Sequence, residues 1–304
     1  LWCVLQFVVL VLSVANAVQV QNLIAGLYAD ARALIGNMEE TDGVRRTVAY
    51  DVSNFEEEIP IVSTASGNLE IVDSEAVFRT LGERAYSLLV CARIGDFVCK
   101  GETLAILYSR RGQAPLSREE TQQLQAAFGL ESKRFTIRDY RFAIQKIVDI
   151  ALRALSPGIN DPGTAISCIQ SLGLLCGKLS QIDGGYAIAK AKTEDGSTHE
   201  IIMEAYNFEA DLYSTYTQIV HYGKGDIMVV LALLNAMKGV LLHTVEANRP
   251  AVAGMAAYIY EAAKPGFTQQ ADLDRLEQCY TALNPAPAGE SALSSPLSPA
   301  AGPQ

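Results

Sequence analysis

Charged and polar residues suited to ligand binding gather in one stretch of this chain, between positions 133 and 165. The candidate binding residues are Arg134, Asp139, Asp149, Arg153, Ser156, Asn160, Asp161 and Thr164. A guanidinium at Arg153 binds anions, and the backbone N–H groups at the start of a helix near Thr164 attract negative charge. The pattern suggests a site for a small anion or a polar headgroup.

The same residues also work as ordinary helix signals. Asp149 and Arg153 have the spacing of a common i, i+4 surface pair, which is weak. Ser-Pro-Gly at 156–158 ends one helix. Asn160 or Asp161 caps the next helix, with Pro162 at its first position. If Asp161 is the cap, its charge competes with a bound anion. Both interpretations stay open, and the sequence alone favours the architectural one.

Other chemistries find little support. The sequence has no G-x-S-x-G motif, and the three histidines, His199, His221 and His243, lie far apart. Cys168 and Cys176 share one face of an expected helix, where packing explains them better than metal binding. The glycines at 173–178 resemble a phosphate loop but have the wrong spacing. We expect no metal ion and no cofactor, and the catalytic residues, if any exist, remain unknown.

Composition narrows the class of partner. The 304 residues carry a formal net charge of −10, which repels phosphate backbones, so we expect no nucleic-acid partner. None of the six cysteines forms C-x-x-C, which favours reduced thiols in a cytosolic compartment over a disulfide framework.

The first eighteen residues are almost entirely apolar and uncharged, which is the lower edge of a membrane span. A signal peptide is the alternative, because Ala15-Asn16-Ala17 has the small-x-small cleavage pattern. Apolar residues continue at helical spacing beyond the run, at Leu23, Leu27, Ala31, Leu34 and Met38. This continuity favours a transmembrane helix followed by a juxtamembrane helix over residues 1–46.

The rest of the chain predicts an α+β protein. Short apolar runs separated by glycines indicate a β-rich module over 47–116, interrupted by a helix that Asp73 caps. Residues 117–283 indicate a helical module, opened by a capping box at Ser117 and Glu120. One hairpin, 186–204, belongs to that module in this interpretation. The apolar segment 227–242 reads as a buried core helix, and the Pro/Ser/Ala-rich tail 284–304 is expected to be disordered.

The segment 94–104 is similar to the G-D-x-V-x-x-G turn of biotinyl and lipoyl-like barrels. No lysine stands at a matching hairpin tip, so cofactor attachment is not indicated. We interpret Gly95 and Gly101 as residues of tight structural turns.

A longer match points to a family. The segment KRFTIRDYRFAIQKIVDIALRALSPGINDPGTA resembles the signature of domain-of-unknown-function family 2254, a family of predicted membrane proteins. Its pattern places an Arg at Arg134, an Asp at Asp139, and then a helix leading into S-P-G-x-N-D-P-x-T-A. Weaker resemblance covers 18–25, 95–98 and 218–223, where Val220 stands in place of an expected Arg. The resemblance implies several membrane helices upstream and no established activity.

Two function classes follow. The first is a non-enzymatic membrane component whose soluble part senses, gates or assembles a transport-type complex. The second is a membrane-anchored enzyme acting on lipid or envelope material, which a deep pocket gathering Arg134, Asp139, Asp149, Arg153 and Asp161 would favour. We expect the lipid bilayer of the inner membrane as a partner. Basic residues after the apolar run place the soluble part in the cytoplasm. Self-association stays open, and the small-molecule ligand is unknown.

Overall fold

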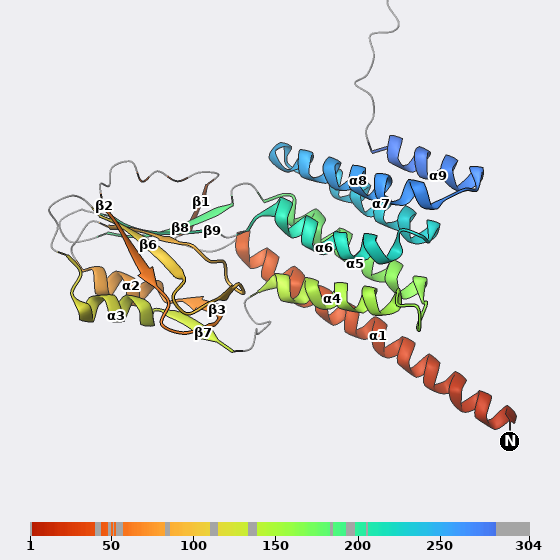
Figure 1. Cartoon of the computed structure of the whole chain (residues 1–304), viewed down its shortest axis with the longest axis horizontal. Coiled ribbons are helices and arrows are strands. Elements are labelled where there is room, and N and C mark those ends of the chain that lie inside the picture. Colours follow the sequence, from red (N-terminus) through yellow and green to blue (C-terminus); the bar gives the residue numbers. More distant parts are fainter. Residues whose placement is uncertain are drawn as a thin grey trace, which may run out of the picture.

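The computed structural model describes residues 2–39, 44–47, 50, 52, 57–82, 86–109, 115–132, 139–182, 185–192, 198–204 and 206–283. Within these ranges, only the backbone is described at 10–19, 39, 44–47, 192 and 198–199. The molecule is elongated, with a β-rich part at one end and a bundle of helices at the other (Figure 1). The mixed α+β class predicted from the sequence is confirmed.

The β-rich part contains two sheets and two short helices. A six-stranded sheet has the order β1-β8-β9-β4-β6-β2, and a three-stranded sheet has the order β5-β3-β7. The strand bounds are β1 Val44–Thr47, β2 Glu57–Val62, β3 Gly67–Val72, β4 Tyr86–Val90, β5 Phe97–Val98, β6 Thr103–Ser109, β7 Phe128–Glu131, β8 Tyr186–Lys192 and β9 Thr198–Glu204. Helices α2 (Ser74–Leu81) and α3 (Arg118–Ala126) lie against these strands and complete a core of their own.

Local capping explains where these two helices begin. The Asp73 carboxylate accepts from the Ala76 N–H at 3.0 Å, as the sequence predicted, and α2 ends at Gly82, whose φ of 59° is left-handed. Ser117 and Glu120 form the predicted capping box of α3.

The hairpin of β8 and β9 adds to the sheet of the β-rich part. The sequence placed it in the helical module, but β9 pairs in parallel with β4, so that Leu88 faces Ile201 across the ladder. Parallel pairing joins strands that are distant in sequence, and here more than one hundred residues separate them. The chain therefore leaves the β-rich part after β7, builds two helices, and returns to it.

The helical part is a bundle with its own core. Its helices are α4 (Tyr140–Ala154), α5 (Pro162–Leu179), α6 (Phe208–Gly223), α7 (Ile227–Leu241), α8 (Arg249–Ala263) and α9 (Gln270–Thr281). The prediction of a buried core helix at 227–242 is confirmed, because α7 buries a stripe of apolar side chains: Val229, Val230, Leu233, Leu234, Met237 and Val240. Helix α7 packs between α5 and α8, and α4 packs between α5 and α6.

Helix α1 (Trp2–Glu39) is continuous over 38 residues and has two different halves. Its second half packs against α4 and α5 and buries Ile24, Ala31 and Ile35 in the helical core. Of the predicted stripe, Leu23 is 54% exposed, whereas Ala31 is buried and Leu27, Leu34 and Met38 pack against the core. Its first half extends away from the bundle (Figure 1), and the apolar side chains at its tip are exposed: Trp2, Val4, Leu5, Phe7, Val8 and Val9.

The predicted transmembrane helix over 1–18 forms the start of α1. Within the residues that the structure describes, no helix combines the length and the apolar character of a membrane span. Much of that predicted span, namely Leu1 and the side chains of 10–18, lies outside the described residues. The predicted disordered tail, 284–304, and residues 193–197 of the predicted hairpin lie outside them as well.

Candidate functional site

The residues predicted as a site divide into two groups at opposite ends of α4. Asp139 is the N-cap of this helix and is 3% exposed. Arg153, Ser156, Asn160, Asp161 and Thr164 lie at its other end or beyond it. A helix of 15 residues is about 22 Å long, so Asp139 and Asp161 do not share a pocket. Arg134 lies outside the described residues.

The loop between α4 and α5 is held by its own hydrogen bonds. The Asp161 carboxylate accepts from the Thr164 N–H at 3.1 Å and from the Thr164 hydroxyl at 2.6 Å. These two bonds lower the pKa of Asp161. The Ser156 hydroxyl donates to the Arg153 carbonyl at 2.6 Å, and Asn160 takes a left-handed φ of 47°. These contacts are those of a helix stop and a helix start.

The expected pair of Asp149 and Arg153 does not form. Asp149 instead accepts from Lys146 at 3.1 Å and from Gln145 at 3.0 Å, on an exposed face of α4. A ligand-binding role for this loop and for Arg153 stays a prediction.

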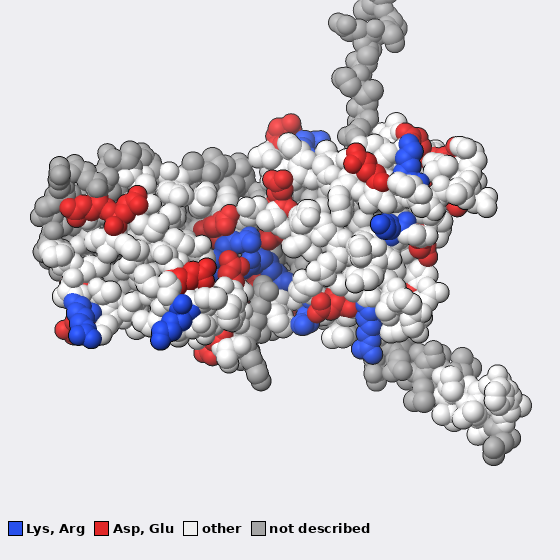
Figure 2. Space-filling view, viewed as in Figure 1, with Lys and Arg blue, Asp and Glu red and all other residues white. Residues whose placement is uncertain are grey.

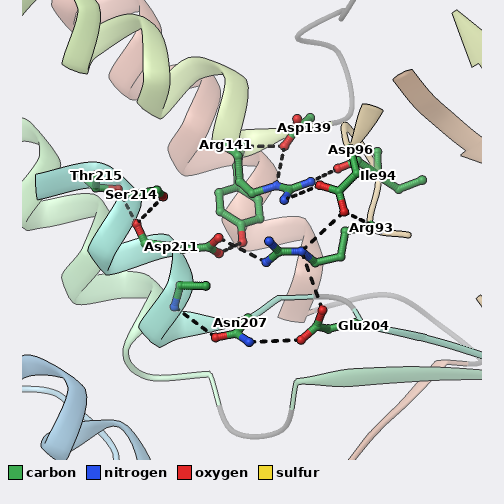
Figure 3. A network of polar contacts seen from close by, with 12 residues as sticks. Arg93, Ile94, Asp96, Asp139, Arg141, Glu204, Asn207, Asp211, Ser214 and Thr215 are labelled. Carbon is green, nitrogen blue, oxygen red and sulfur yellow. Dashed lines mark hydrogen bonds and ion pairs between the residues drawn. The ribbon is translucent and has the colours of Figure 1, made fainter. Parts of the chain in front are cut away.

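A second group of charged residues lies where the two parts of the molecule meet. We call it the junction cluster: Arg93, Asp96, Asp139, Tyr140, Arg141, Glu204 and Asp211. Figure 2 shows basic side chains gathered between the β-rich end and the helical end, flanked by acidic ones. The cluster is drawn in Figure 3. It joins the loop after β4, the end of β9, the start of α4 and the first turns of α6.

Arg141 holds the start of α4 to the turn between β4 and β5. Its guanidinium contacts Asp139 at 3.4 Å and Asp96 at 3.0 Å, and it donates to the carbonyl of Ile94. The Arg141 side chain is 16% exposed, so these contacts lie in partial shelter from water. Gly95 lets this turn close, because its φ of 90° is one that residues with a Cβ rarely adopt. The turn predicted from the glycines is thus also the contact surface for α4.

Arg93 connects the same turn to α6. Its guanidinium lies 3.3 Å from the Asp211 carboxylate, 3.7 Å from Glu204 and 3.9 Å from Asp96. Asp96 also accepts from the Arg93 backbone N–H at 2.9 Å, which fixes the turn around the side chain. The Tyr140 hydroxyl donates to the other oxygen of Asp211 at 2.5 Å. Figure 3 shows Arg93 between Glu204, Asp96 and Asp211.

Burial dominates the electrostatics of the cluster. The pKa of Asp211 is raised by desolvation, even though Tyr140 and Arg93 stabilise its charged form. The pKa of Tyr140 is raised well above its ordinary value by burial and then by the Asp211 charge. Burial alone would lower the pKa of Arg141, but the charges of Asp139 and Asp96 outweigh it and raise that pKa. The Tyr140 hydroxyl therefore stays protonated as a donor.

The arrangement joins two parts of a molecule and shows no reacting pair. Two guanidinium groups face four carboxylates, and their hydrogen bonds run to each other across four separate elements. In the part of the chain that the structure describes, no three His, Cys, Asp or Glu side chains are placed to hold a metal ion. The cluster is suited to transmit a displacement of α4 or α6 to the β-rich part.

The sequence contained signals for some of these residues. Asp211 stands on the buried face of its helix, three residues after Phe208 and one before Leu212, where an acid needs a partner. In the sequence, Asp96 stands in the predicted turn at 94–104, and Arg141 lies within the segment that resembles the family signature. Sequence spacing could not pair them, because 45 residues separate Arg141 from Asp96 and 118 separate Arg93 from Asp211.

Comparison with known proteins agrees with the family resemblance. Residues 1–239 match the sequence profile of a family described as predicted membrane protein (DUF2254). The uncharacterized protein Rv1290c of Mycobacterium tuberculosis is 29% identical over 237 residues, which is 77% of this chain and 44% of the relative. The uncharacterized protein Mb1321c of Mycobacterium bovis shows the same identity and coverage. The chain thus spans less than half of the length of these relatives, and no solved structure matches it significantly.

Proposed function

Since this chain belongs to the DUF2254 family of predicted membrane proteins, we propose that it is a membrane-anchored coupling module. In this proposal the apolar first half of α1 lies in the bilayer, and the bundle and the β-rich part stand outside it. The module senses, gates or assembles with the membrane part of the protein. The family assignment supports membrane attachment and carries no specific activity.

The single observation that carries the proposal is the continuity of α1. One unbroken helix bears exposed apolar side chains at its tip, such as Trp2 and Phe7, and core residues such as Ile35 in its second half. Exposed apolar side chains cost free energy in water and gain it in lipid. A helix without a break between the two halves transmits tilt or rotation directly, because its backbone hydrogen bonds keep it stiff.

The path onward from α1 passes through α4. Helix α1 packs against α4, and α4 begins at Asp139, Tyr140 and Arg141, which belong to the junction cluster. A displacement of α1 relative to the bundle would therefore move the groups that hold the turn at Asp96 and the Asp211 carboxylate of α6. We place the coupling in this order: bilayer, α1, α4, junction cluster, β-rich part.

Basic residues after the apolar half set the orientation in this proposal. Arg32 follows it within about twenty residues, the range that the positive-inside rule counts, and Arg45 and Arg46 lie farther along the chain. We therefore place the bundle and the β-rich part on the cytoplasmic side of the inner membrane.

Membrane insertion of α1 can be tested with charged variants. The double variant Leu5→Arg/Val9→Arg places two guanidinium groups in the apolar half, where such a group costs roughly 2.5 to 3.5 kcal/mol at the centre of a membrane helix. The matched control, Leu23→Arg/Ala33→Arg, adds the same charge at exposed positions of the second half. In alkaline carbonate extraction of membranes, the first variant should be released while the wild type and the control stay in the pellet. Equal behaviour of the two variants would refute anchoring by this half.

A further inference from the structure

A groove of about 840 Å³ runs along the bundle between α1, α5 and α7. Tyr28 and Arg32 come from α1, Leu174 and Lys178 from α5, and Met228 and Leu231 from α7. The groove is mostly apolar, and Leu174 and Met228 are 63% and 56% exposed. Apolar side chains exposed inside a concave surface are typical of a ligand site. The groove is separate from the junction cluster.

The three helices run in the same direction, and this gives the groove two different ends. Gln21 of α1 donates to Ser167 of α5 at 3.5 Å, which places Arg32 at the level of Lys178. The Cβ of Ala236 lies close to Gly173, and the Val245 N–H donates to the Ser180 carbonyl at 3.1 Å. Residue numbers in α5 and α7 therefore increase in the same direction along the groove. Ile166 and Met228 lie at one end, and Lys178 and His243 lie at the other.

Charge is confined to one end. Arg32 and Lys178 line the far end, together with the His243 side chain and the amide of Gln181. No Asp or Glu lines the groove among the residues that the structure describes, although the whole chain carries 34 acidic residues against 24 basic ones. The apolar end, at Ile166 and Met228, is the end on the side of the first half of α1. A ligand that matches this surface has a long apolar part and an anionic head.

Glycines leave room for such a chain. Gly173 and Gly177 let α5 approach α7 closely, because a Cβ at position 173 would meet Ala236 at 3.1 Å. Gly239 also lines the groove, but a Cβ added there would meet no atom within 4 Å. Larger side chains at position 239 would thus project into open space of the groove instead of into the core.

We propose that this groove binds a long-chain fatty acid, with its carboxylate at Arg32, Lys178 and His243 and its hydrocarbon chain running towards Ile166 and Met228. The distance along α5 from Ile166 to Lys178 is about 18 Å, which suits an extended chain of this class. The site itself does not depend on membrane insertion of α1. Only the supply of ligand from the bilayer rests on the proposed function.

Photo-crosslinking tests both the site and the direction of the chain. The full chain is reconstituted in nanodiscs of phosphatidylcholine and exposed to palmitic acid that carries a diazirine near its methyl end. Cross-links should map to peptides around Ile166 and Met228. Unlabelled palmitate should compete for labelling, and the uncharged methyl ester should compete about tenfold less, because it lacks the anionic head.

Two variants with matched controls separate ligand recognition from folding. Arg32→Gln/Lys178→Gln removes two groove cations, while Lys238→Gln/Arg275→Gln removes two exposed cations elsewhere on the bundle. Gly239→Leu fills the groove, while Gly254→Leu adds the same group on α8, where a Cβ also meets no atom within 4 Å. Labelling should fall about tenfold in each groove variant, since each loses either the head contacts or the space for the chain, and stay at the wild-type level in each control.

Three results would overturn the proposal. Labelling that the groove variants leave unchanged would place the fatty acid elsewhere. Equal competition by the methyl ester would show that the cationic end does not select the head. Cross-links from the methyl end to the Lys178 end would reverse the ligand. If the carbonate extraction shows no anchoring by α1 but labelling of the groove is retained, the proposed function is refuted and the fatty-acid site still holds.

Discussion

The Tyr140 hydroxyl donates a 2.5 Å hydrogen bond to the Asp211 carboxylate, and this bond ties the start of α4 to the first turns of α6. The Asp211 side chain is 7% exposed and shares its other oxygen with Arg93 of the β-rich part. Three segments thus meet on one buried carboxylate. A buried charge is costly unless hydrogen bonds and opposite charges surround it, so each partner of Asp211 has a measurable role.

Tyr140→Phe should lower the free energy of unfolding by about 1.5 to 3 kcal/mol at neutral pH, because it removes a donor from a buried carboxylate. Burial raises the folded-state pKa of Asp211, so its ionised form costs stability. As the pH falls through that raised value, Asp211 takes up a proton and needs the donor less. The cost of Tyr140→Phe should therefore shrink on acidification. Denaturant unfolding at several pH values measures it, with the exposed Tyr213→Phe on α6 as control.

A cost of Tyr140→Phe that stays constant from pH 7 to about pH 4 would show that Asp211 does not titrate in this range. The Tyr140 hydroxyl would then donate to an ionised Asp211 throughout this range, and the expected rise in the pKa of Asp211 would be refuted.

Arg141→Gln should loosen the joint between α4 and the turn after β4. It leaves Asp139, which is 3% exposed, without its guanidinium partner, at a cost of about 3 kcal/mol. Arg141→Lys should recover little, because an ammonium cannot reach Asp139, Asp96 and the Ile94 carbonyl together. Hydrogen exchange should rise at 93–98 and stay unchanged in α9. Arg249→Gln, which breaks an exposed pair with Glu246, is the control and should cost less than about 1 kcal/mol.

Asp161→Ala tests the architectural role of the loop between α4 and α5. Loss of the two bonds from Thr164 should lower stability by about 1 kcal/mol, and Asp161→Asn should retain most of it. The folded-state pKa of Asp161 is lowered, so this stabilisation is present above its unfolded pKa and is lost as the pH falls through the folded value. Thermal unfolding measures this loss of stability, with Asp149→Ala at an exposed position of α4 as the control. If Asp161→Ala is as stable as the wild type, capping of α5 does not explain the role of Asp161.

Orientation can be measured on a native thiol. Cys99 is exposed in the β-rich part, far from the apolar half of α1. In intact cells that express the full-length protein, a membrane-impermeant maleimide should leave Cys99 unmodified until the membrane is opened. Modification in sealed cells would place the β-rich part outside the cytoplasm, while anchoring by α1 would still hold. Cys99→Ser provides the background signal.

The sequence predicted those features that depend on near neighbours. The caps at Asp73, Ser117 and Asp161 are local hydrogen bonds within three residues. The first two were placed correctly, and for α5 the sequence left Asn160 and Asp161 open, of which Asp161 is the cap. That α7 is a core helix follows from its apolar composition alone. The pairing of β9 with β4 and the contact of Arg141 with Asp96 depend on tertiary folding, and no spacing rule finds them. The groove was equally hidden, because α1, α5 and α7 are far apart in the chain.

The depth of α1 in a bilayer tests the central claim most directly. One variant keeps Cys3, has its other cysteines replaced by alanine, and carries a spin label at Cys3. The second variant has all native cysteines replaced by alanine and carries the label at position 23 after Leu23→Cys. In liposomes, relaxation by oxygen should exceed relaxation by a water-soluble nickel complex at Cys3, and the reverse should hold at position 23. Strong nickel relaxation at both positions would show that the apolar half of α1 stays in water, and would contradict membrane anchoring by this helix.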